Sequence, residues 1–244
     1  MPRFFISSPT PPNTGEPFLL EGDTAHHISR SLRMKPGEEV TLCDGKGLDY
    51  SGEILAITDS AVTVTIKEVL PSQTEPSVQV TLFQGLPKGD KMELIVQKAV
   101  ELGAYAIAPV LTRRSISQPD QKSAEKKTQR WQKIANEAAQ QSQRGSLPQV
   151  RPLISFAQAL EQCDEFDKIL VCYEGGGLPI AETVLPDDQK IAVFIGPEGG
   201  WEESEIEALR QRGAQIITLG PRILRTETAP LAVLSVLMYV TGNM

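Results

Sequence analysis

Apolar and polar residues alternate along the first third of the chain. Short stretches of this alternation surround Val40, Ile54 and Val62. A period of two is typical of β-strands that bury one face, so these stretches predict short strands joined by turns. They indicate a small β-barrel, interrupted by a helix-like insert from Thr24 to Met34.

The pattern changes after residues 70–77, a polar stretch with prolines that has the composition of a linker. From Val78 onward, apolar runs of strand length alternate with longer runs of helical period. The expected strands cover residues 78–83, 105–111, 168–173, 190–195 and 215–219. Repeated strand, helix, strand order favours a parallel sheet with helices on both faces. We therefore expect two domains, at residues 1–72 and 73–244, the second of the α/β class.

Helix-start signals support this order. Glu93 follows Asp90 by three residues and Gln158 follows Ser155 in the same way, which predicts two capping boxes. The last predicted helix, from Thr228 to Val240, is largely apolar and has a proline in its first turn, where proline is tolerated.

The formal net charge of −7 disfavours a nucleic-acid partner for the chain as a whole, because phosphate binding needs cationic surface. Residues 113–151 depart from this average, with nine Lys or Arg against three acidic residues. The predicted helix after Ser123 places apolar residues from Trp131 to Ala139 on one stripe, which leaves the other face to the cations. This segment is a candidate RNA-binding surface, and a solvated helix face is the alternative interpretation.

Composition is that of an ordinary globular protein, with 40% hydrophobic and 23% charged residues. No apolar run reaches the roughly 18 residues of a membrane helix, and the start lacks the apolar stretch of a secretory signal.

Three widely spaced cysteines fit reduced thiols better than disulfides or a zinc site. The adjacent His26 and His27 would point about 100° apart on a helix, so we expect packing or capping there and no metal. These features predict a soluble, cytoplasmic protein without a membrane partner.

Glycine-rich segments follow three of the predicted strands. They read CYEGGG at 172–177, IGPEGGW at 195–201 and LGPRILRTET at 219–228. In open α/β sheets, ligands bind beyond the carboxyl ends of the strands, where glycine lets the backbone come close. Glycine also occurs in ordinary flexible turns, but three such segments at consecutive strand ends favour one shared binding site.

The same segments restrict the kind of ligand. Neither the G-x-G-x-x-G pattern of dinucleotide sites nor the G-K-[ST] pattern of triphosphate sites is present. The helix after GPEGGW begins with Glu202, Glu203 and Glu205, which suit a helix N-terminus but repel phosphate. An uncharged adenosine with a sulfonium tail fits better, since backbone groups can read adenine while apolar side chains cover its face. We therefore expect S-adenosylmethionine as the cofactor.

Several motifs together carry a family resemblance over nearly the whole chain. They are RFF at 3–5, HH and LRM between 26 and 34, KGDKME at 88–93, QKAVELG at 97–103, RWQKI at 130–134, GPEGGW at 196–201 and LGPRILRTETAP at 219–230. With these motifs the chain resembles the SPOUT class of methyltransferases, and specifically the RsmE family of 16S ribosomal RNA uridine-N3 methyltransferases. Gln140 stands where members of that family often carry glutamate.

The resemblance implies a fold and an activity. The fold would be an N-terminal PUA-like β-barrel for RNA binding at 1–72 and a SPOUT methyltransferase domain at 73–244, an α/β domain with a parallel sheet and a trefoil knot. The protein would be a homodimer that binds S-adenosylmethionine within the knot and holds no metal. Its substrate would be uridine 1498 of 16S rRNA in the small ribosomal subunit, methylated at N3.

Candidate site residues come from the loops, the resemblance and the charge pattern. We choose Arg225 as the catalytic residue, because a guanidinium can stabilise the negative charge of a uracil that has lost its N3 proton; an ion pair with Glu227 or Glu198 is the alternative. The expected cofactor-binding residues are Cys172, Tyr173, Glu174, Ile195, Gly196, Pro197, Glu198, Gly199, Gly200, Leu219, Gly220, Ile223, Leu224, Arg225, Thr226, Thr228 and Ala229. The expected RNA-binding residues are Arg3, Arg30, Arg33, Lys35, Lys88, Arg113, Arg114, Arg130 and Arg144.

Two other functions fit parts of the sequence. A non-catalytic RNA-binding protein would rely on the barrel and bind no cofactor. A nucleotide-dependent oxidoreductase on an ordinary Rossmann sheet would bind NADH, although the glycine fingerprint of such proteins is missing. Titration with S-adenosylmethionine and with NADH distinguishes the three.

Overall fold

The computed structural model describes residues 1–6, 8, 10–185 and 188–244. The chain forms two compact units, each made from two stretches of sequence. The first unit contains Met1–Glu75 and Ala139–Leu147, and the second contains Pro76–Ala138 and Pro148–Met244. The chain therefore passes between the units three times.

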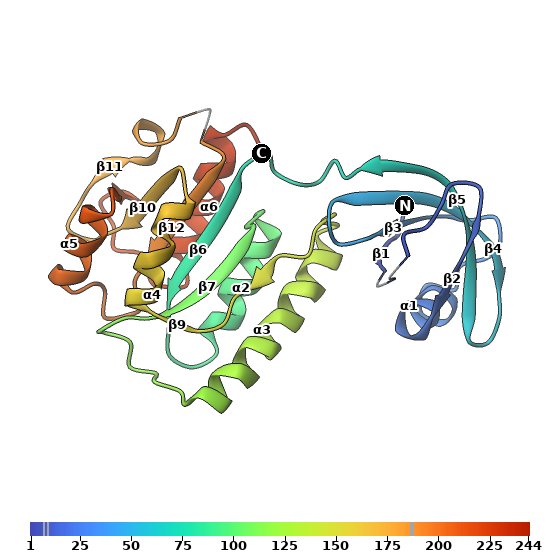
Figure 1. Cartoon of the computed structure of the whole chain (residues 1–244), viewed down its shortest axis with the longest axis horizontal. Coiled ribbons are helices and arrows are strands. Elements are labelled where there is room, and N and C mark those ends of the chain that lie inside the picture. Colours follow the sequence, from blue (N-terminus) through green and yellow to red (C-terminus); the bar gives the residue numbers. More distant parts are fainter. Residues whose placement is uncertain (7, 9, 186–187) are drawn as a thin grey trace. The chain divides into compact units, whose positions relative to one another are not determined.

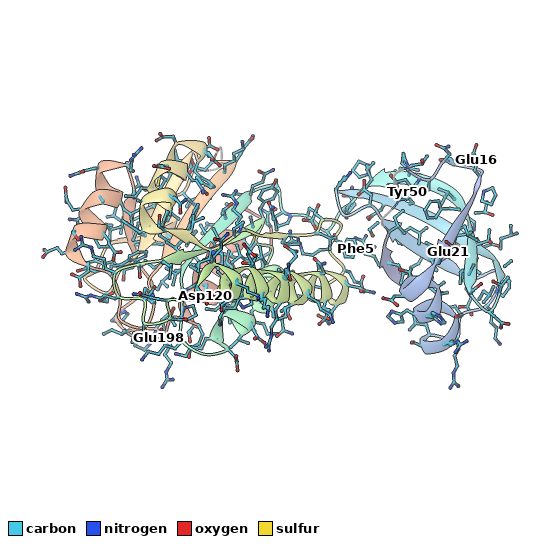
Figure 2. All side chains as sticks on the ribbon, turned by 60° about the horizontal axis from the view of Figure 1, so that its bottom comes forward. Phe5, Glu16, Glu21, Tyr50, Asp120 and Glu198 are labelled. Atoms are coloured by element: carbon cyan, nitrogen blue, oxygen red, sulfur yellow. The ribbon has the colours of Figure 1, made fainter. Side chains whose placement is uncertain are left out.

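The first unit is a curled five-stranded sheet around its own core (Figure 1). Its strands run in the order β1-β3-β4-β5-β2, antiparallel except for the parallel pair β1 and β3. Buried side chains such as Val40, Tyr50 and Val64 fill the core. Tyr50 is labelled in this unit in Figure 2. The elements are β1 (Arg3–Phe5), β2 (Pro17–Glu21), α1 (Gly22–His26), a π-helical turn (His27–Ser31), β3 (Glu39–Cys43), β4 (Leu48–Ile57) and β5 (Ala61–Pro71). The helical insert predicted up to Met34 thus ends at Ser31.

Residues from the middle of the chain complete the first unit. The buried Arg144 side chain pairs with Glu75, with Nη2 2.6 Å from Oε2. The other carboxylate oxygen of Glu75 accepts the backbone N–H groups of Gly145 and Ser146 at 2.9 and 3.3 Å. One glutamate therefore fixes a remote segment to the end of the linker.

The second unit is built on a parallel sheet, which confirms the predicted α/β class. Its strand order is β11-β13-β10-β12-β6-β7-β8, with β9 also beside β7. The strands are β6 (Gln79–Gly85), β7 (Ala106–Leu111), β8 (Gln149–Val150), β9 (Ile154–Ser155), β10 (Lys168–Cys172), β11 (Leu178–Pro179), β12 (Lys190–Ile195) and β13 (Gln215–Thr218). Three consecutive neighbours, β13, β10 and β12, are the strands that precede the glycine-rich segments.

Helices cover both faces of this sheet (Figure 1). On one face, α4 (Phe156–Glu161) and α5 (Glu203–Gln211) pack over Phe83 and Phe194, whose rings stack with centroids 4.5 Å apart. On the other face, α2 (Lys91–Glu101) and α6 (Ala229–Val240) pack against each other. Short 3-10 turns at 162–165 and 180–182 complete the connections.

The long helix α3 (Gln121–Gln141) carries much of the basic segment. Asp120, which Figure 2 labels at one end of the helix, caps its start by accepting the N–H of Ser123 at 2.7 Å. This hydrogen bond lowers the pKa of the Asp120 carboxyl. Trp131, Ala135 and Ala138 are buried along one side. The predicted amphipathic spacing is therefore confirmed.

The two predicted capping boxes have different outcomes. At α4, Ser155 Oγ accepts the N–H of Gln158 at 3.2 Å and the Gln158 side chain accepts the N–H of Ser155 at 2.9 Å, which confirms the prediction. At α2 the prediction is wrong, because the Asp90 side chain makes no capping bond. Asp90 has φ −96° and ψ 8°, away from the extended geometry of a cap, and Glu93 pairs with Arg130 instead.

Within the described residues, no helix is long and apolar enough to cross a membrane. The same part of the chain holds no group of His, Cys, Asp and Glu arranged for a metal ion. Its three cysteines are free. Burial raises the pKa of Cys43 to about 12 and that of Cys163 to about 11, so both thiols stay protonated and serve in packing.

Candidate active site

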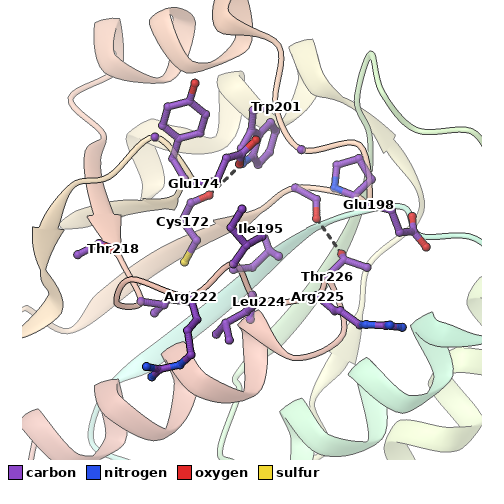
Figure 3. A pocket seen from close by; sticks show the side chains of 18 of the residues that line it. Cys172, Glu174, Ile195, Glu198, Trp201, Thr218, Arg222, Leu224, Arg225 and Thr226 are labelled. Atoms are coloured by element: carbon purple, nitrogen blue, oxygen red, sulfur yellow. Dashed lines mark hydrogen bonds between the residues drawn. The ribbon is translucent and has the colours of Figure 1, made fainter.

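A cavity of about 1010 Å³ opens at the carboxyl ends of β10, β12 and β13 (Figure 3). Its walls are residues 172–176 after β10, 195–201 at the end of β12 and 218–226 at the end of β13. Because these strands are parallel neighbours, their carboxyl ends meet at one edge of the sheet. This is where ligand sites form in open α/β sheets.

The cavity brings together every predicted cofactor-binding residue except Thr228, which is exposed and lies outside the lining. It is also lined by residues that the sequence prediction did not include: Lys91, Gly175, Gly176, Trp201, Thr218, Pro221 and Arg222. Most of these lie within the quoted glycine-rich segments. Lys91 comes from α2, and only its place in the KGDKME motif could have drawn attention to it.

Two glycines allow the walls to come close. A Cβ on Gly85, at the end of β6, would lie 2.6 Å from the backbone nitrogen of Pro197. Gly200 has φ +68°, a conformation that L side chains rarely adopt, and a Cβ there would lie 2.5 Å from Glu174 Oε1. A side chain at Gly85 would push the loop 196–201 out of place, whereas one at Gly200 would strain the backbone and displace the Glu174 carboxylate.

Buried hydrogen bonds fix both ends of the loop 196–201. Thr226 Oγ1 donates to the carbonyl of Gly196 at 2.8 Å, and Gln84 Nε2 donates to Thr226 Oγ1 at 3.0 Å. Trp201 Nε1 donates to the carbonyl of Cys172 at 3.1 Å (Figure 3). Because buried polar groups are costly to leave without partners, these bonds tie the loop to β6, to β10 and to the segment before α6.

Charged groups hold the middle of the same loop. Lys91 Nζ lies 2.9 Å from Glu198 Oε1 and 3.3 Å from Glu227 Oε2, and the Lys88 N–H donates to Glu198 Oε1 at 3.1 Å. Burial acts to raise the pKa of Glu198, but the hydrogen bonds from Lys91 and Lys88 outweigh it and hold this pKa below its ordinary value. The bond to Glu198 also raises the pKa of Lys91. Glu198 and Lys91 are therefore both charged at neutral pH.

Arg225 lies at the rim of the cavity with an exposed side chain. Its Nη1 is 3.9 Å from Glu227 Oε1, and its side chain is 82% exposed. In Figure 3 the guanidinium extends away from Ile195 and Leu224. An exposed pair at this distance contributes little, and Glu198 is engaged by Lys91, so the guanidinium is accessible to a ligand from outside.

Comparison with known proteins decides the family. The family model of an RNA methyltransferase domain matches residues 74–238, and that of an RNA methyltransferase PUA domain matches residues 20–67. Ribosomal RNA small subunit methyltransferase E of Bacillus subtilis (strain 168) is 39% identical over an alignment of 249 positions, which covers 99% of this chain and 97% of that protein. The chain belongs to the ribosomal RNA small subunit methyltransferase E family.

Solved structures agree with this family assignment. Ribosomal RNA small subunit methyltransferase E from Neisseria gonorrhoeae, bound to S-adenosyl methionine, is 34% identical with a TM-score of 0.86 and 98% of both chains covered. A methyltransferase from Legionella pneumophila, also with this cofactor bound, is 30% identical with a TM-score of 0.82, and 97% and 96% of the two chains are covered. The predicted family and the predicted pairing of a PUA-like domain with an α/β methyltransferase domain are confirmed.

Two of the residues predicted to bind RNA have side chains that are largely buried in the first unit. The Arg3 side chain is 11% exposed, pairs with Asp49 and donates to the carbonyl of Gln143 at 2.9 Å. The Arg144 side chain is 5% exposed and pairs with Glu75. Both join the two stretches of sequence that form the unit, so the structure gives them a structural role.

The other predicted RNA-binding residues are more accessible. Arg30, Arg33, Lys35, Lys88 and Arg113 are exposed. Arg130 is exposed and pairs with Glu93, with Nη2 2.8 Å from Oε1. Arg114 pairs with Glu202, with Nε 2.8 Å from Oε1.

Proposed function

We propose that this family member is the S-adenosylmethionine-dependent enzyme that methylates N3 of uridine 1498 in the 16S rRNA of the small ribosomal subunit. The observation that carries the proposal is the cavity between three glycine-rich segments. It occurs in a chain that matches, over 98% of its length, a relative whose structure contains S-adenosyl methionine. The position of the uridine comes from the family resemblance.

The residues of the cavity fit this cofactor, which supplies the methyl group when it is bound. Ile195 and Leu224 offer apolar surface to an adenine ring, while neighbouring glycines leave backbone groups accessible to its edge. Glu174 is also a lining residue, and its negative charge favours a ligand with a positively charged sulfonium, whereas the charge of Glu198 is balanced by Lys91. The volume of about 1010 Å³ admits a ligand of that size.

The chain's own residues divide the reaction between two tasks. Methyl transfer needs N3 of uracil to lose its proton and to lie in line with the methyl group. The loop 196–201, tied down at Gly196 and Trp201, would hold the methyl donor still. In the proposal Arg225 binds the uracil carbonyl oxygens, whose negative charge grows as the N3 proton leaves, and its two-pronged guanidinium suits that task.

RNA would be bound by exposed cations of both units. We propose that residues 1–72 act as the PUA-like RNA-binding domain, through Arg30, Arg33 and Lys35, and that residues 73–244 carry out the transfer. Lys88, Arg113 and Arg130 would contact phosphates nearer the cavity, and the uracil would leave its stack to enter it. A ribosomal substrate also supports the predicted cytoplasmic location.

The family further suggests a homodimer and a trefoil knot in the second domain. Large apolar side chains on α2 and α6 are exposed, with Leu94 at 44%, Val236 at 39% and Tyr239 at 72%. Exposed apolar groups on two adjacent helices support a protein interface there. Light scattering should give twice the chain mass of 26.6 kDa, and a single-chain mass would contradict the dimer.

Two measurements test the proposed function. Calorimetric titration should show binding of S-adenosylmethionine and none of NADH; the opposite result favours an oxidoreductase, and binding of neither favours a non-catalytic RNA-binding protein. Mass mapping of 16S rRNA from cells that lack the gene should show one methyl group missing at the proposed uridine. An unchanged methylation map would refute the assignment.

A further inference from the structure

Residues 112–115, which follow β7, support the loop 196–201 from outside the cavity. Arg114 Nη1 donates to the carbonyl of Gly199 at 2.9 Å, and Arg114 Nε donates to Glu202 Oε1 at 2.8 Å. The Arg113 N–H donates to Glu205 Oε1 at 2.9 Å. Gly199 is one of the described residues that line the cavity, and Arg114 is not.

Arg114 and Gly199 also fit closely together. A Cβ added to Gly199 would lie 3.0 Å from Arg114 Cβ and 3.5 Å from Arg114 Cδ. The side chain of Arg114 therefore covers the outer side of the glycine, while its guanidinium bonds both the glycine carbonyl and the first residue before α5. A planar guanidinium can reach two acceptors in this way, whereas the single ammonium of lysine has a different geometry.

The charges around Arg114 are mainly negative. Its hydrogen bond to Glu202 raises the pKa of Arg114, and the negative charges of Glu174 and Glu205 raise this pKa further. The same bond lowers the pKa of Glu202, so both groups stay charged. The side chains of Arg114 and Glu202 are 43% and 40% exposed, so we expect the pair to add little to folding stability. An effect on the cavity can therefore be separated from an effect on the fold.

We propose that Arg114, which its charge marks as an RNA contact, is a positioning residue that sets the Gly199–Gly200 wall of the cofactor pocket. It acts through the loop and does not itself touch the ligand. The proposal rests on the proposed function, because it takes S-adenosylmethionine as the ligand. Its consequence is that this arginine governs cofactor affinity even when no RNA is present.

The test is calorimetric titration of RNA-free protein with S-adenosylmethionine and with S-adenosylhomocysteine. Arg114→Ala should raise the dissociation constants of both ligands by a similar factor, about five- to tenfold, which is the usual net worth of one intramolecular hydrogen bond. Arg114→Lys should remain close to Arg114→Ala, because one ammonium does not reproduce both bonds. Arg212→Ala is the matched control, because Arg212 is a partly exposed arginine that pairs with Asp164 and does not line the cavity, and it should leave both constants within about twofold.

Comparing the two ligands distinguishes a positioning role of Arg114 from a direct effect of its charge on the ligand. S-adenosylmethionine carries one more positive charge than S-adenosylhomocysteine. If Arg114 acted by charge alone, Arg114→Ala would strengthen binding of the sulfonium and leave the other ligand unchanged. That result, recovery of affinity in Arg114→Lys, or unchanged affinity in Arg114→Ala would each overturn the proposal.

Further measurements distinguish a loosened loop from a loss of overall folding stability. Hydrogen exchange in a peptide covering 197–202 should be faster in Arg114→Ala, and Glu202→Gln should weaken both ligands by a smaller factor because the guanidinium keeps its bond to Gly199. Unfolding curves should show unchanged stability. If the unaltered protein binds neither ligand, the proposed function itself is wrong; if it binds both and Arg114→Ala binds them equally well, only the role of Arg114 is wrong.

Discussion

Two walls of the same cavity are built in opposite ways. In the loop 196–201, the carbonyl of Gly196, the carboxylate of Glu198 and the carbonyl of Gly199 all accept hydrogen bonds from residues distant in sequence. In the segment 219–225, by contrast, Ile223 is 85% exposed and the Arg225 side chain is 82% exposed. The hydrogen bond at Gly220 is local, from its N–H to Thr218 Oγ1 at 3.2 Å.

The difference indicates a division of labour. A wall with many distant hydrogen bonds keeps its shape before a ligand arrives, which reduces the ordering that binding requires. A segment with exposed side chains and local bonds opens at lower free energy and can close over a ligand. The loop 196–201 is thus suited to fixing the cofactor, and the segment 219–225 to covering it and to contacting the substrate.

Removing the proposed catalytic guanidinium should have the largest effect. Arg225→Ala should lower the methylation rate on small subunits at least about 100-fold, because a charged hydrogen-bond donor to the developing negative charge is lost. Cofactor affinity and unfolding stability should change little, since the side chain is exposed. Arg212→Ala, an exposed arginine paired with Asp164, is the control for loss of one surface charge. Undiminished turnover in Arg225→Ala would remove this residue from the mechanism.

Removing the hydrogen bonds of the buried Thr226 should have the next largest effect, a loss of both stability and cofactor affinity. Thr226→Val removes the donor to Gly196 and the acceptor for Gln84, so the free energy of unfolding should fall by about 2 kcal/mol. Cofactor affinity should fall with it. Thr183→Val is the matched control, because Thr183 is also buried and donates to a carbonyl, that of Ile180, at 2.8 Å but does not line the cavity. Equal losses of cofactor affinity in both variants would argue against a specific role for Thr226.

Shortening Ile223, an exposed apolar residue on the second wall, should have a smaller effect. It should change cofactor affinity without changing stability. Ile223→Ala should leave unfolding stability unchanged, because the side chain is already in water. If the segment closes over the ligand, the dissociation constant of S-adenosylmethionine should rise about tenfold as apolar contact is lost. Leu178→Ala is the control, because Leu178 is a half-exposed apolar residue outside the cavity lining. Unaltered affinity would show that Ile223 stays uncovered.

The smallest effect concerns pH. Because the pKa of Glu198 is held below its ordinary value of 4.5, its contribution to stability is complete above that value and is lost as the pH falls through the lowered pKa. Unfolding should therefore show a larger stability for the unaltered protein than for Glu198→Gln at neutral pH, and the difference should shrink in acid. Glu203→Gln, in the first turn of α5, controls for removal of a surface carboxylate. A difference that grew in acid would contradict the assigned sign.

The sequence predicted those features of the fold that depend on local pattern. Period-two alternation around Val62 and the amphipathic stripe from Trp131 both correspond to observed elements, β5 and α3. Glycine-rich strand ends also indicated which residues line the cavity, because neighbouring parallel strands end at the same edge. Where a local signal competed with tertiary contacts it failed, as at Asp90, whose expected partner Glu93 pairs with Arg130 of α3.

Supports that join distant segments were beyond reach of the sequence. Gln84 and Thr226 are separated by 142 positions, and nothing in either neighbourhood predicts that they meet. The charge of Arg114 indicated a phosphate contact, but only the folded chain shows that its guanidinium reaches Gly199. Likewise, the charge of Arg144 could not reveal that the side chain is buried against Glu75.

The bond between Arg144 and Glu75 also bears on how the gene could be divided. A fragment that stops after the linker would keep the Glu75 carboxylate but lose the guanidinium and the two backbone amides that bind it. Such a fragment should fold only if residues 139–147 are joined to it through a short linker. The second unit, expressed alone, then needs a new connection between residues 138 and 148. Exchange of the N-terminal module between relatives therefore requires two coordinated cuts, since a single crossover just after Glu75 would separate this glutamate from Arg144.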